Sequence, residues 1–204
     1  MEKIRCDWST KDSIYIAYHD NEWGVPLYDD QKLFEFLILE TFQAGLSWIT
    51  VLRKRNNFRK AFDYFDYKKV ALYGEDKMQE LLLDAGIIRN KLKVRAAISN
   101  ARAFMQIQKE YGSFDKYIWG FVGGKPLQNN RKTMSEITPT TKISDKLSKD
   151  LKKKGFKFVG STVVYALMQA TGMVNDHVES CFRFKELNND NLKSFCSNFK
   201  SNFI

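Results

Sequence analysis

Two cysteines and both histidines of this 204-residue chain lie in pairs near its two ends. Cys6 and His19 form the first pair, and His177 and Cys181 form the second. On a helix, the i, i+4 spacing of the second pair would place both side chains on one face. Two thiolates and two imidazoles suit tetrahedral zinc. The sequence therefore predicts one structural zinc ion that joins the ends of the chain.

Two simpler interpretations of these residues remain open. Single cysteines and histidines are often buried without a metal, and two cysteines can form a disulfide. However, the number of cysteines is odd, and residues 1–8 are polar rather than an apolar signal segment. An oxidising compartment is therefore not expected. The third cysteine, Cys196, is assigned no role.

Glu40 is a carboxylate inside an apolar segment. Its helical neighbours are Phe36, Leu37 and Ala44, so we expect it to be at least partly buried. A buried carboxylate is costly unless it has a partner or a function, and Gln43 lies one helical turn away. One interpretation is a structural glutamate that tyrosine hydroxyls satisfy.

The same quarter of the chain is rich in aromatic residues, namely Trp8, Tyr15, Tyr18, Trp23, Phe42 and Trp48. Ordinary core packing is one interpretation of any single ring. A carboxylate among aromatic rings would instead suit a flat, positively charged ligand, because the rings stack on it and attract its charge.

Residues 144–172 combine lysines with a short segment that has a glycine at each end. We expect a basic amphipathic helix over 144–154, a tight hairpin from Gly155 to Gly160 and a second helix over 161–172. The glycines allow a sharp turn, and the free N–H groups that begin the second helix can bind an anion. This helix-hairpin-helix pattern would bind DNA phosphates without reading base sequence. A plain helical hairpin with exposed lysines is the alternative.

The overall charge also favours a polyanionic partner. The chain has 33 Lys plus Arg against 24 Asp plus Glu, a formal net charge of +9, and basic residues cluster in 53–60, 89–102 and 142–157. Nucleic acid is the natural partner for three such patches. The longest apolar run, near 33–39, contains Glu35, so no membrane span is expected. We expect a cytoplasmic, monomeric protein.

Helices should dominate the fold, because apolar residues recur mostly at i, i+3 and i+4 spacing and there are only three prolines. Further helices are predicted over 30–44, 47–62, 67–72, 76–83, 90–111 and 114–121, with a long loop over 123–141. In helix 90–111, Leu92, Ala96 and Ile107 should face inward and Lys93 outward. Residues 1–187 should form one domain and 188–204 a tail or short helix.

Several of these segments together resemble one known family. YIAYHDNEWGVP (15–26), QAGLSWITVL (43–52), DAGIIR (84–89), GFKFVG (155–160) and VNDHV (174–178), with Glu40, closely resemble type I bacterial 3-methyladenine DNA glycosylase. The resemblance covers roughly residues 4–182. It implies the all-helical fold of the helix-hairpin-helix glycosylases, with two lobes around a cleft. It also implies a structural zinc on Cys6, His19, His177 and Cys181.

The resemblance implies that the protein hydrolyses the N-glycosidic bond of 3-methyladenine in double-stranded DNA and leaves an abasic site. Glu40 would be the functional carboxylate. The implied base-binding residues are Tyr15, Tyr18, Trp48, Trp8 and Gln43. The expected DNA contacts are Gly155, Lys157, Gly160, Ser161 and Lys154, with Leu46 as a wedge that fills the gap left by a flipped base. Core packing is the alternative for Leu46.

One motif departs from the wider superfamily. Many relatives carry a catalytic Asp in a Val-Asp-x-His sequence, and Asn175 stands at that position here. Asp176 is therefore not assigned as catalytic. Two other functions compete with the enzyme: a non-catalytic DNA-binding module, which would not need Tyr18, Glu40 and Trp48, and a zinc-stapled interaction protein, which would not need the basic clusters.

Overall fold

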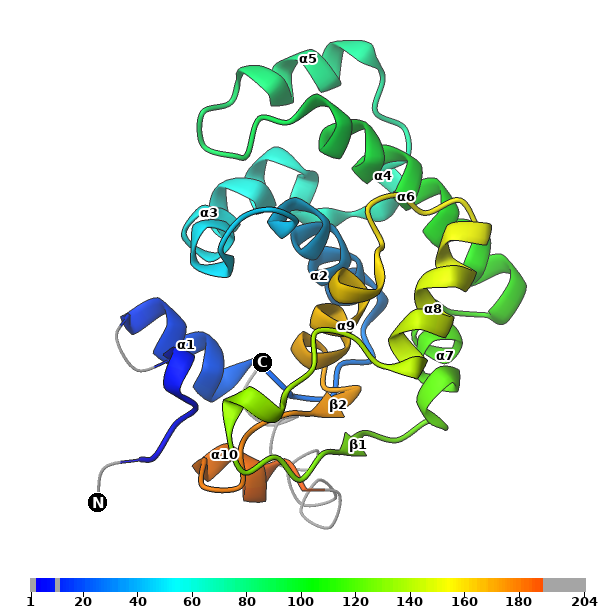
Figure 1. Cartoon of the computed structure of the whole chain (residues 1–204). Coiled ribbons are helices and arrows are strands. Elements are labelled where there is room, and N and C mark those ends of the chain that lie inside the picture. The colour runs from blue at the N-terminus through cyan, green and yellow to red at the C-terminus, as the bar shows by residue number, and fades with distance from the viewer. Residues whose placement is uncertain (1–2, 10–11, 189–204) are drawn as a thin grey trace, which may run out of the picture.

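A computed structural model describes residues 3–9 and 12–188, and helices dominate this part of the chain, as predicted (Figure 1). The α-helices are α1 (Ser13–Asn21), α2 (Asp30–Gln43), α3 (Trp48–Ala61), α4 (Tyr67–Val70), α5 (Glu75–Leu83), α6 (Lys91–Tyr111), α7 (Phe114–Trp119), α8 (Lys142–Lys153), α9 (Ser161–Ala170) and α10 (Phe182–Glu186). Short 3-10 helices are η1 (Asp7–Ser9), η2 (Asp63–Phe65), η3 (Gly120–Val122) and η4 (Met134–Glu136). The predicted tail over 189–204, with Cys196, lies outside the described residues.

Helix α2 lies at the centre of the fold (Figure 1). It packs against α3, α6, α7 and α9. Asp29 caps its first turn, as predicted, by accepting a hydrogen bond from the backbone N–H of Lys32 at 2.9 Å. The buried side of α2 includes Leu33, Phe34, Leu37, Ile38 and Phe42. Because α2 is surrounded on several sides, a polar residue in its second half is removed from water.

Helix α1 is absent from the prediction. Its apolar residues do not form one buried stripe: Tyr18 and His19 are buried, but Ile14 is 40% exposed. Its start depends on a local cap, in which Asp12 accepts a hydrogen bond from the backbone N–H of Ile14 at 2.8 Å. The helix brings two aromatic residues and one histidine of the predicted site to the same region.

At the start of α6, Leu92 and Lys93 face the opposite way from the prediction. Leu92 is 64% exposed, whereas Lys93 is 6% exposed. Lys93 Nζ donates to the backbone oxygens of Phe42 at 2.8 Å and Ala44 at 2.6 Å. These carbonyls end α2 and lack partners inside their own helix. The lysine therefore points inward because it satisfies them, and the prediction that it faces solvent is wrong.

A short parallel pairing holds the segment that follows α7 against the segment that follows α9. Strand β1 (Leu127–Gln128) pairs with β2 (Val174–Asn175), with Leu127 opposite Val174, and an isolated bridge joins Arg131 to Val178. The prediction of one long loop over 123–141 therefore misses β1 and η4. Two-residue strands are too short to show an alternating apolar pattern in the sequence.

His177 and Cys181 lie in the turn between β2 and α10, so the helical placement considered for their i, i+4 spacing does not apply. The backbone N–H of Cys181 donates to the carbonyl oxygen of Val178 at 2.8 Å. This turn, rather than a helical face, brings the two side chains together. Within the described residues, no helix combines the length and the apolar character needed to cross a bilayer.

Candidate active site

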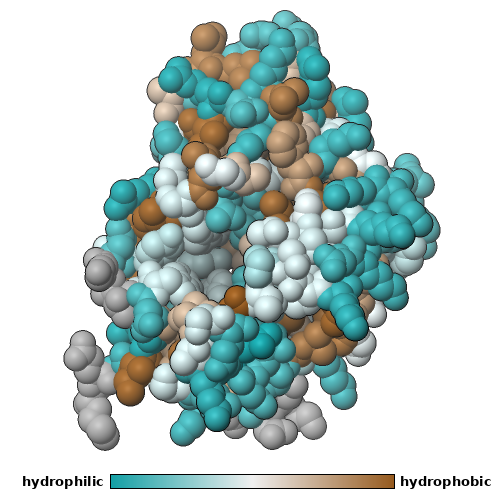
Figure 2. Space-filling model, viewed as in Figure 1, coloured by the Kyte–Doolittle hydropathy of each residue, from teal (hydrophilic) through white to brown (hydrophobic). Residues whose placement is uncertain are grey.

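A cavity of about 450 Å³ opens where α1, the second half of α2, the start of α3 and α9 meet. Figure 2 shows this face of the molecule hollowed near its centre, with a surface of intermediate hydropathy around the hollow. The cavity is lined by Trp8, Tyr15, Tyr18, Trp23, Glu40, Gln43, Ser47, Trp48, Met134, Ile137, Ala166 and Gln169. The structure therefore brings together all six residues predicted for base recognition and chemistry.

Among the described residues that line this cavity, Glu40 is the only carboxylate. It is 3% exposed, and its Oε2 atom has no hydrogen-bond partner within the described part of the chain. Burial raises the pKa of Glu40 to about 8. The cavity thus contains a buried acid that forms no ion pair with the described residues.

Aromatic rings surround this acid. The rings of Tyr18 and Trp48 have centroids 5.5 Å apart and a tilt of 53°. Trp8 contacts Tyr15 and Trp23 edge-on, with centroid distances of 5.3 and 5.1 Å. Such walls offer both apolar area and the negative faces of π systems.

Two polar groups of the aromatic wall are also informative. Tyr15 is fixed because its hydroxyl oxygen accepts a hydrogen bond from the backbone N–H of Ile49 at 3.0 Å, which ties α1 to the first turn of α3. Trp48 Nε1 is buried without a partner in the described residues. Burial, and then the charge of Glu40, raise the pKa of Tyr18, which therefore stays protonated.

The sequence prediction missed six cavity residues. Trp23 and Ser47 lie in segments that were recognised, but they were not assigned to the site. Met134 and Ile137 reach the cavity through the segment anchored by β1, and Ala166 and Gln169 through one face of α9. These four residues reach the cavity only because their segments pack against it from distant parts of the chain. Local sequence patterns therefore could not have assigned them to the site.

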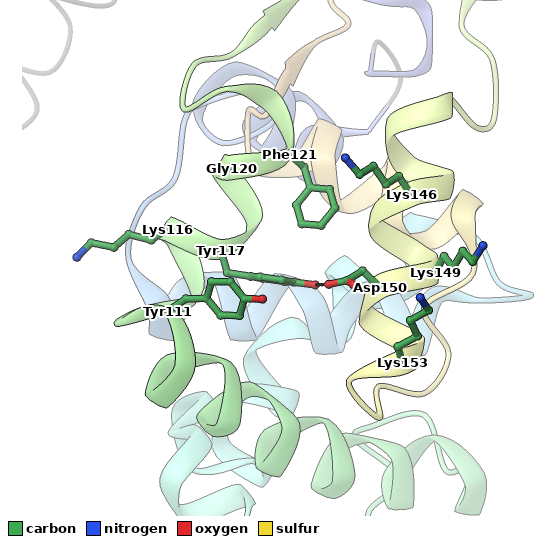
Figure 3. Close-up of a pocket in the computed structure, with 9 residues that line it drawn as sticks. All are labelled: Tyr111, Lys116, Tyr117, Gly120, Phe121, Lys146, Lys149, Asp150 and Lys153. Atoms are coloured by element: carbon green, nitrogen blue, oxygen red, sulfur yellow. Dashed lines mark hydrogen bonds between the residues drawn. The ribbon is translucent and has the colours of Figure 1, made fainter.

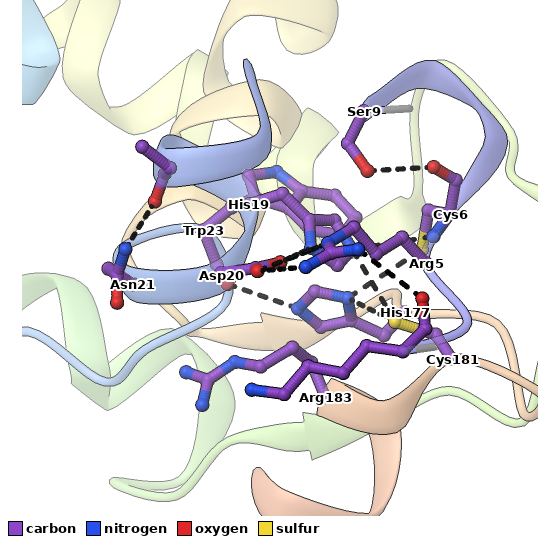
Figure 4. Close-up of polar contacts among 12 residues, drawn as sticks. Arg5, Cys6, Ser9, His19, Asp20, Asn21, Trp23, His177, Cys181 and Arg183 are labelled. Carbon is purple, nitrogen blue, oxygen red and sulfur yellow. Dashed lines mark hydrogen bonds and ion pairs between the residues drawn. The ribbon is translucent and has the colours of Figure 1, made fainter. Parts of the chain in front are cut away.

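Cys6, His19, His177 and Cys181 form a buried cluster, and their four potential ligand atoms all lie within 4.8 Å of one another (Figure 4). Cys181 Sγ lies 3.4 Å from His19 Nε2 and 3.5 Å from His177 Nδ1. Cys6 Sγ lies 3.6 Å from His177 Nδ1. In a zinc tetrahedron with bonds of about 2.0–2.3 Å, neighbouring ligand atoms lie roughly 3.3–3.8 Å apart. The donor set and its spacing therefore fit zinc.

The outer nitrogens of the two imidazoles are also engaged. His19 Nδ1 bonds to Asp20 Oδ1 at 2.8 Å, and Arg5 holds that carboxylate through its guanidinium at 2.7 Å (Figure 4). His177 Nε2 bonds to the carbonyl oxygen of Trp23 at 3.1 Å. A carboxylate or carbonyl behind each imidazole fixes its tautomer and is usual for histidines that bind a metal.

The turn between α8 and α9 has the geometry of the predicted hairpin. Gly155 has φ +92°, a conformation that favours glycine. Gly160 begins α9 without a side-chain cap, and a Cβ atom there would meet nothing within 4 Å. The side chain of Asn100 fixes the hairpin by bonding to the backbone N–H and carbonyl of Lys157 at 2.8 and 3.1 Å. The first N–H groups of α9 are therefore not covered by a capping side chain.

The predicted DNA-contact residues differ in their availability. Lys157 is exposed, and Ser161 is half-buried with its hydroxyl 2.8 Å from that of Ser144. Lys154 pairs with Glu110 at 2.9 Å, so its charge is partly engaged within the protein. Leu46 is 42% exposed in the turn between α2 and α3, beside the cavity residues Gln43 and Ser47.

A larger hollow of about 510 Å³ lies between α7 and α8 (Figure 3). Lys146, Lys149 and Lys153 project from α8 along its edge, and Figure 2 shows a hydrophilic surface over this helix. Its one carboxylate, Asp150, accepts a hydrogen bond from the Tyr117 hydroxyl at 2.8 Å. This hollow suits an anion and lacks the unpartnered acid of the first cavity.

Comparison with known proteins places these features in one family. The sequence profile of the methyladenine glycosylase family matches residues 8–184. The chain belongs to the methyladenine glycosylase family. DNA-3-methyladenine glycosylase 1 of Escherichia coli (strain K12) is 54% identical over 177 residues, which cover 87% of this chain and 95% of the relative.

Solved structures of the methyladenine glycosylase family share the fold. A crystal structure of 3-methyladenine DNA glycosylase I has a TM-score of 0.86 and 51% identity, covering 88% of this chain and 98% of that one. A crystal structure of a Tyr-to-Phe variant of 3-methyladenine DNA glycosylase I, in complex with 3-methyladenine, has a TM-score of 0.85 and 36% identity, covering 87% and 96%. The profile match includes all twelve cavity residues and the hairpin, whereas Cys6 lies just before its start.

Proposed function

We propose that this protein is a monofunctional DNA glycosylase that hydrolyses the N-glycosidic bond of 3-methyladenine in alkylated DNA and leaves an abasic site. The observation that carries the proposal is the buried Glu40, whose Oε2 atom has no hydrogen-bond partner among the described residues, in a cavity walled by aromatic rings. Membership of the methyladenine glycosylase family and the likeness to a relative solved with 3-methyladenine support it.

The chemistry of the substrate suits this cavity. Methylation at N3 gives the base a positive charge, so cleavage of the bond between the sugar C1′ and N9 lets the electron pair leave on a neutral base. Water then bonds to C1′ and gives up a proton. Such a leaving group needs little general-acid assistance, so selection and exposure of the base become the main tasks of the protein. Base flipping, at a cost of a few kcal/mol, would bring the base into the cavity.

Recognition would depend on charge as well as shape. Trp48, Tyr18 and Tyr15, with Trp8 closing the wall, would stack on the cationic ring, at about 1–2 kcal/mol for each desolvated cation–π contact. Glu40 would accept hydrogen bonds from the adenine edge, with Gln43 beside it. A cation in the cavity favours the ionised carboxylate, so binding of the base would draw a proton from Glu40. Neutral adenine would lack both the cation–π attraction and the charge attraction to Glu40, and should therefore bind more weakly.

A lyase step is not part of the proposal, because it needs an amine nucleophile in the cavity. No lysine is among the described residues that line it. The nearby Lys93 is bound to the backbone oxygens of Phe42 and Ala44. Its pKa is lowered by burial, but the two hydrogen bonds direct its ammonium group to the end of α2.

DNA would be held by a helix-hairpin-helix unit that consists of α8, the turn over 154–160 and α9. The uncovered N–H groups at Gly160 and Ser161 would bind a phosphate, and Lys157 would add positive charge. Lys149 and Lys153 border both the hollow beside α7 and a second hollow that reaches Ser161, so the basic surface continues away from the hairpin. Lys154 would contribute less because of its pairing with Glu110.

Leu46 would fill the space of the flipped base. Gly45 has φ +81° with open space around it, which lets the α2–α3 turn project. A Leu46→Gly variant should flip a fluorescent base analogue at least about tenfold less readily. Undiminished flipping would remove this role.

The Cys6, His19, His177 and Cys181 cluster would hold one structural zinc ion. Four protein ligands leave no position for water, so the ion would stabilise the fold rather than take part in hydrolysis. Residues 1–187 would act as one domain and as a monomer.

The hydrogen bond from Cys6, together with the two imidazoles, lowers the pKa of the Cys181 thiol, and the same contact raises the pKa of Cys6. The pair therefore supplies one thiolate by itself, and binding of zinc would release the proton of the other.

The experiment that tests the function is release of free bases from DNA methylated with dimethyl sulfate. The protein should release 3-methyladenine, identified by chromatography, and leave alkali-sensitive abasic sites. A non-catalytic DNA-binding module would bind the same DNA and release nothing. A protein that binds alkylated DNA without any release would therefore overturn the proposal.

A further inference from the structure

Asp176 lies at the centre of a buried polar network beside the cavity. It is 1% exposed. Its Oδ2 atom accepts hydrogen bonds from the Tyr165 hydroxyl at 2.6 Å and from Gln169 Nε2 at 2.8 Å. Its Oδ1 atom accepts one from Asn129 Nδ2 at 2.7 Å. The carboxylate thus accepts from three neutral donors of α9 and of the segment that follows β1, and the guanidinium of Arg131 lies 3.9 Å from Oδ1.

Gln169 is the member of this network that lines the cavity. An ionised carboxylate can only accept, so Asp176 requires the NH₂ group of Gln169 to face it. The amide is planar, and its oxygen consequently points away from Asp176. Oε1 has no hydrogen-bond partner in the part of the chain that the structure describes. An amide that could turn over by itself is therefore held in one orientation, with a free acceptor.

The network is built to keep this orientation. Burial, and then the hydrogen bond to Asp176, raise the pKa of Tyr165, so its hydroxyl remains a donor. Asn129 contributes a second donor from the segment anchored by the β1–β2 pairing. With both partners fixed as donors, Asp176 presents the same acceptor to Gln169 throughout.

We propose that Gln169, oriented by Asp176, supplies a second hydrogen-bond acceptor to the cavity and selects bases that carry an amino group at C6. In this arrangement Gln169 contacts the base, and Asp176 is a positioning residue. The inference rests on the proposed glycosylase function and deepens it. It assigns a role to the carboxylate beside the position where many relatives carry their catalytic aspartate.

The chemistry of the bases gives this acceptor its selectivity. Adenine carries an amino group at C6, which offers two N–H donors. Guanine carries a carbonyl oxygen at the same position, which can only accept. Two acceptors in the cavity, Glu40 and Gln169 Oε1, would attract the first group and repel the second. Alkylated guanines are cationic too, so stacking and charge alone would not exclude them.

The test exchanges donor and acceptor across the Asp176–Gln169 contact. In Asp176→Asn, the new amide can donate, so Gln169 is free to turn its NH₂ group toward the cavity. In the double variant Asp176→Asn/Gln169→Glu, the new Asn donates to the new carboxylate, which again offers an acceptor to the cavity. Initial rates of 3-methyladenine and 7-methylguanine release are measured on the same methylated DNA.

For Asp176→Asn, we expect the ratio of 3-methyladenine to 7-methylguanine release to fall at least about tenfold, as expected for a hydrogen bond to a charged base. The double variant should recover most of that ratio. Tyr73→Phe is the matched control: it removes a tyrosine hydrogen bond to another carboxylate, that of Asp63, outside this network, and should leave the ratio unchanged. An unchanged ratio in Asp176→Asn, or a double variant that recovers nothing, would overturn the inference.

Binding of free bases separates this inference from the proposed function. Quenching of tryptophan fluorescence by 3-methyladenine should weaken at least about tenfold in Asp176→Asn and recover in the double variant. If the wild-type protein binds the free base with this pattern but releases none from DNA, the glycosylase proposal fails and the role of Gln169 stands. If release occurs and the free-base pattern is absent, the role of Gln169 fails alone.

Discussion

The indole of Trp23 lies edge-on to the imidazole of His177, with ring centroids 4.5 Å apart and an interplanar angle of 78°. His177 Nε2 also bonds to the Trp23 carbonyl oxygen at 3.1 Å. Trp23 lines the cavity and contacts Trp8, whose ring lies 5.4 Å from that of His19. The aromatic wall and the Cys/His cluster therefore form one packed unit.

Loss of a cluster ligand should destabilise this unit. We expect Cys181→Ser to lose its bound zinc and about 3 kcal/mol of the free energy of unfolding. Because the melting temperature of a chain of this size changes by ~2–4 °C for each kcal/mol, it should fall by roughly 6 °C or more. Elemental analysis and thermal unfolding measure both effects. The matched control, Cys196→Ser, keeps the four ligands and should retain one zinc ion per chain. Full zinc content in Cys181→Ser would contradict the assignment.

Replacement by glutamine should change the free energy of unfolding differently at two buried glutamates of α2. Glu35 is 7% exposed and pairs with Arg55 at 2.6 Å and Arg59 at 2.8 Å, whereas Glu40 Oε2 has no partner in the described residues. Glu35→Gln leaves the buried Arg55 with Glu22 as its remaining carboxylate partner and should lower the free energy of unfolding by about 2–4 kcal/mol. Glu40→Gln should leave it unchanged or raise it. Urea unfolding at pH 7 makes the comparison, and equal losses would show that Glu40 has a hidden partner.

Because the pKa of Glu40 is raised in the folded protein, its contribution to the free energy of unfolding should decrease as the pH rises. Its pKa is about 8 in the folded protein and 4.5 in the reference state. The folded state therefore binds more protons between these values. Relative to Glu40→Gln, the free energy of unfolding should be highest below pH 4.5 and should fall up to about pH 8, by at most ~1.4 kcal/mol per pH unit.

Activity should follow the opposite trend, because the ionised carboxylate attracts the cationic base. We expect kcat/KM of the wild-type protein to rise with pH until about pH 8, and that of Glu40→Gln to be flat over the same range. Parallel profiles for the two proteins would assign the titration to another group.

Much of this site was predictable from local sequence, and the missing parts depend on contacts distant in the chain. Glu40 could be recognised as buried because its helical neighbours are apolar, and the Cys/His set because of its residue types. Lys93 was misassigned because its partners, the carbonyls that end α2, are 49 and 51 residues away. Gln169 gave no signal, because its importance depends on Asp176 and on the packing of α9 against the cavity.

DNA binding should depend on the lysines near the hairpin. Lys153→Ala/Lys157→Ala should weaken binding of alkylated and unmodified duplexes alike, and reduce the slope of log affinity against log salt by up to ~0.9 for each phosphate that the protein no longer neutralises. Fluorescence anisotropy at several salt concentrations measures this slope. Lys109→Ala removes an exposed lysine near the end of α6 and should leave it unchanged. An unaltered slope in the double variant would show that Lys153 and Lys157 do not contact DNA phosphates.

The most direct measurement is the single-turnover release of 3-methyladenine from methylated DNA by the wild-type protein and by Glu40→Gln. The substitution keeps the shape of the side chain and removes its charge, and truncation of a buried charge pair typically costs about 2–5 kcal/mol. We predict release by the wild-type protein and a rate at least ~30-fold lower for a folded Glu40→Gln. Equal rates for the two proteins would contradict the central role of Glu40 in recognition of a cationic base.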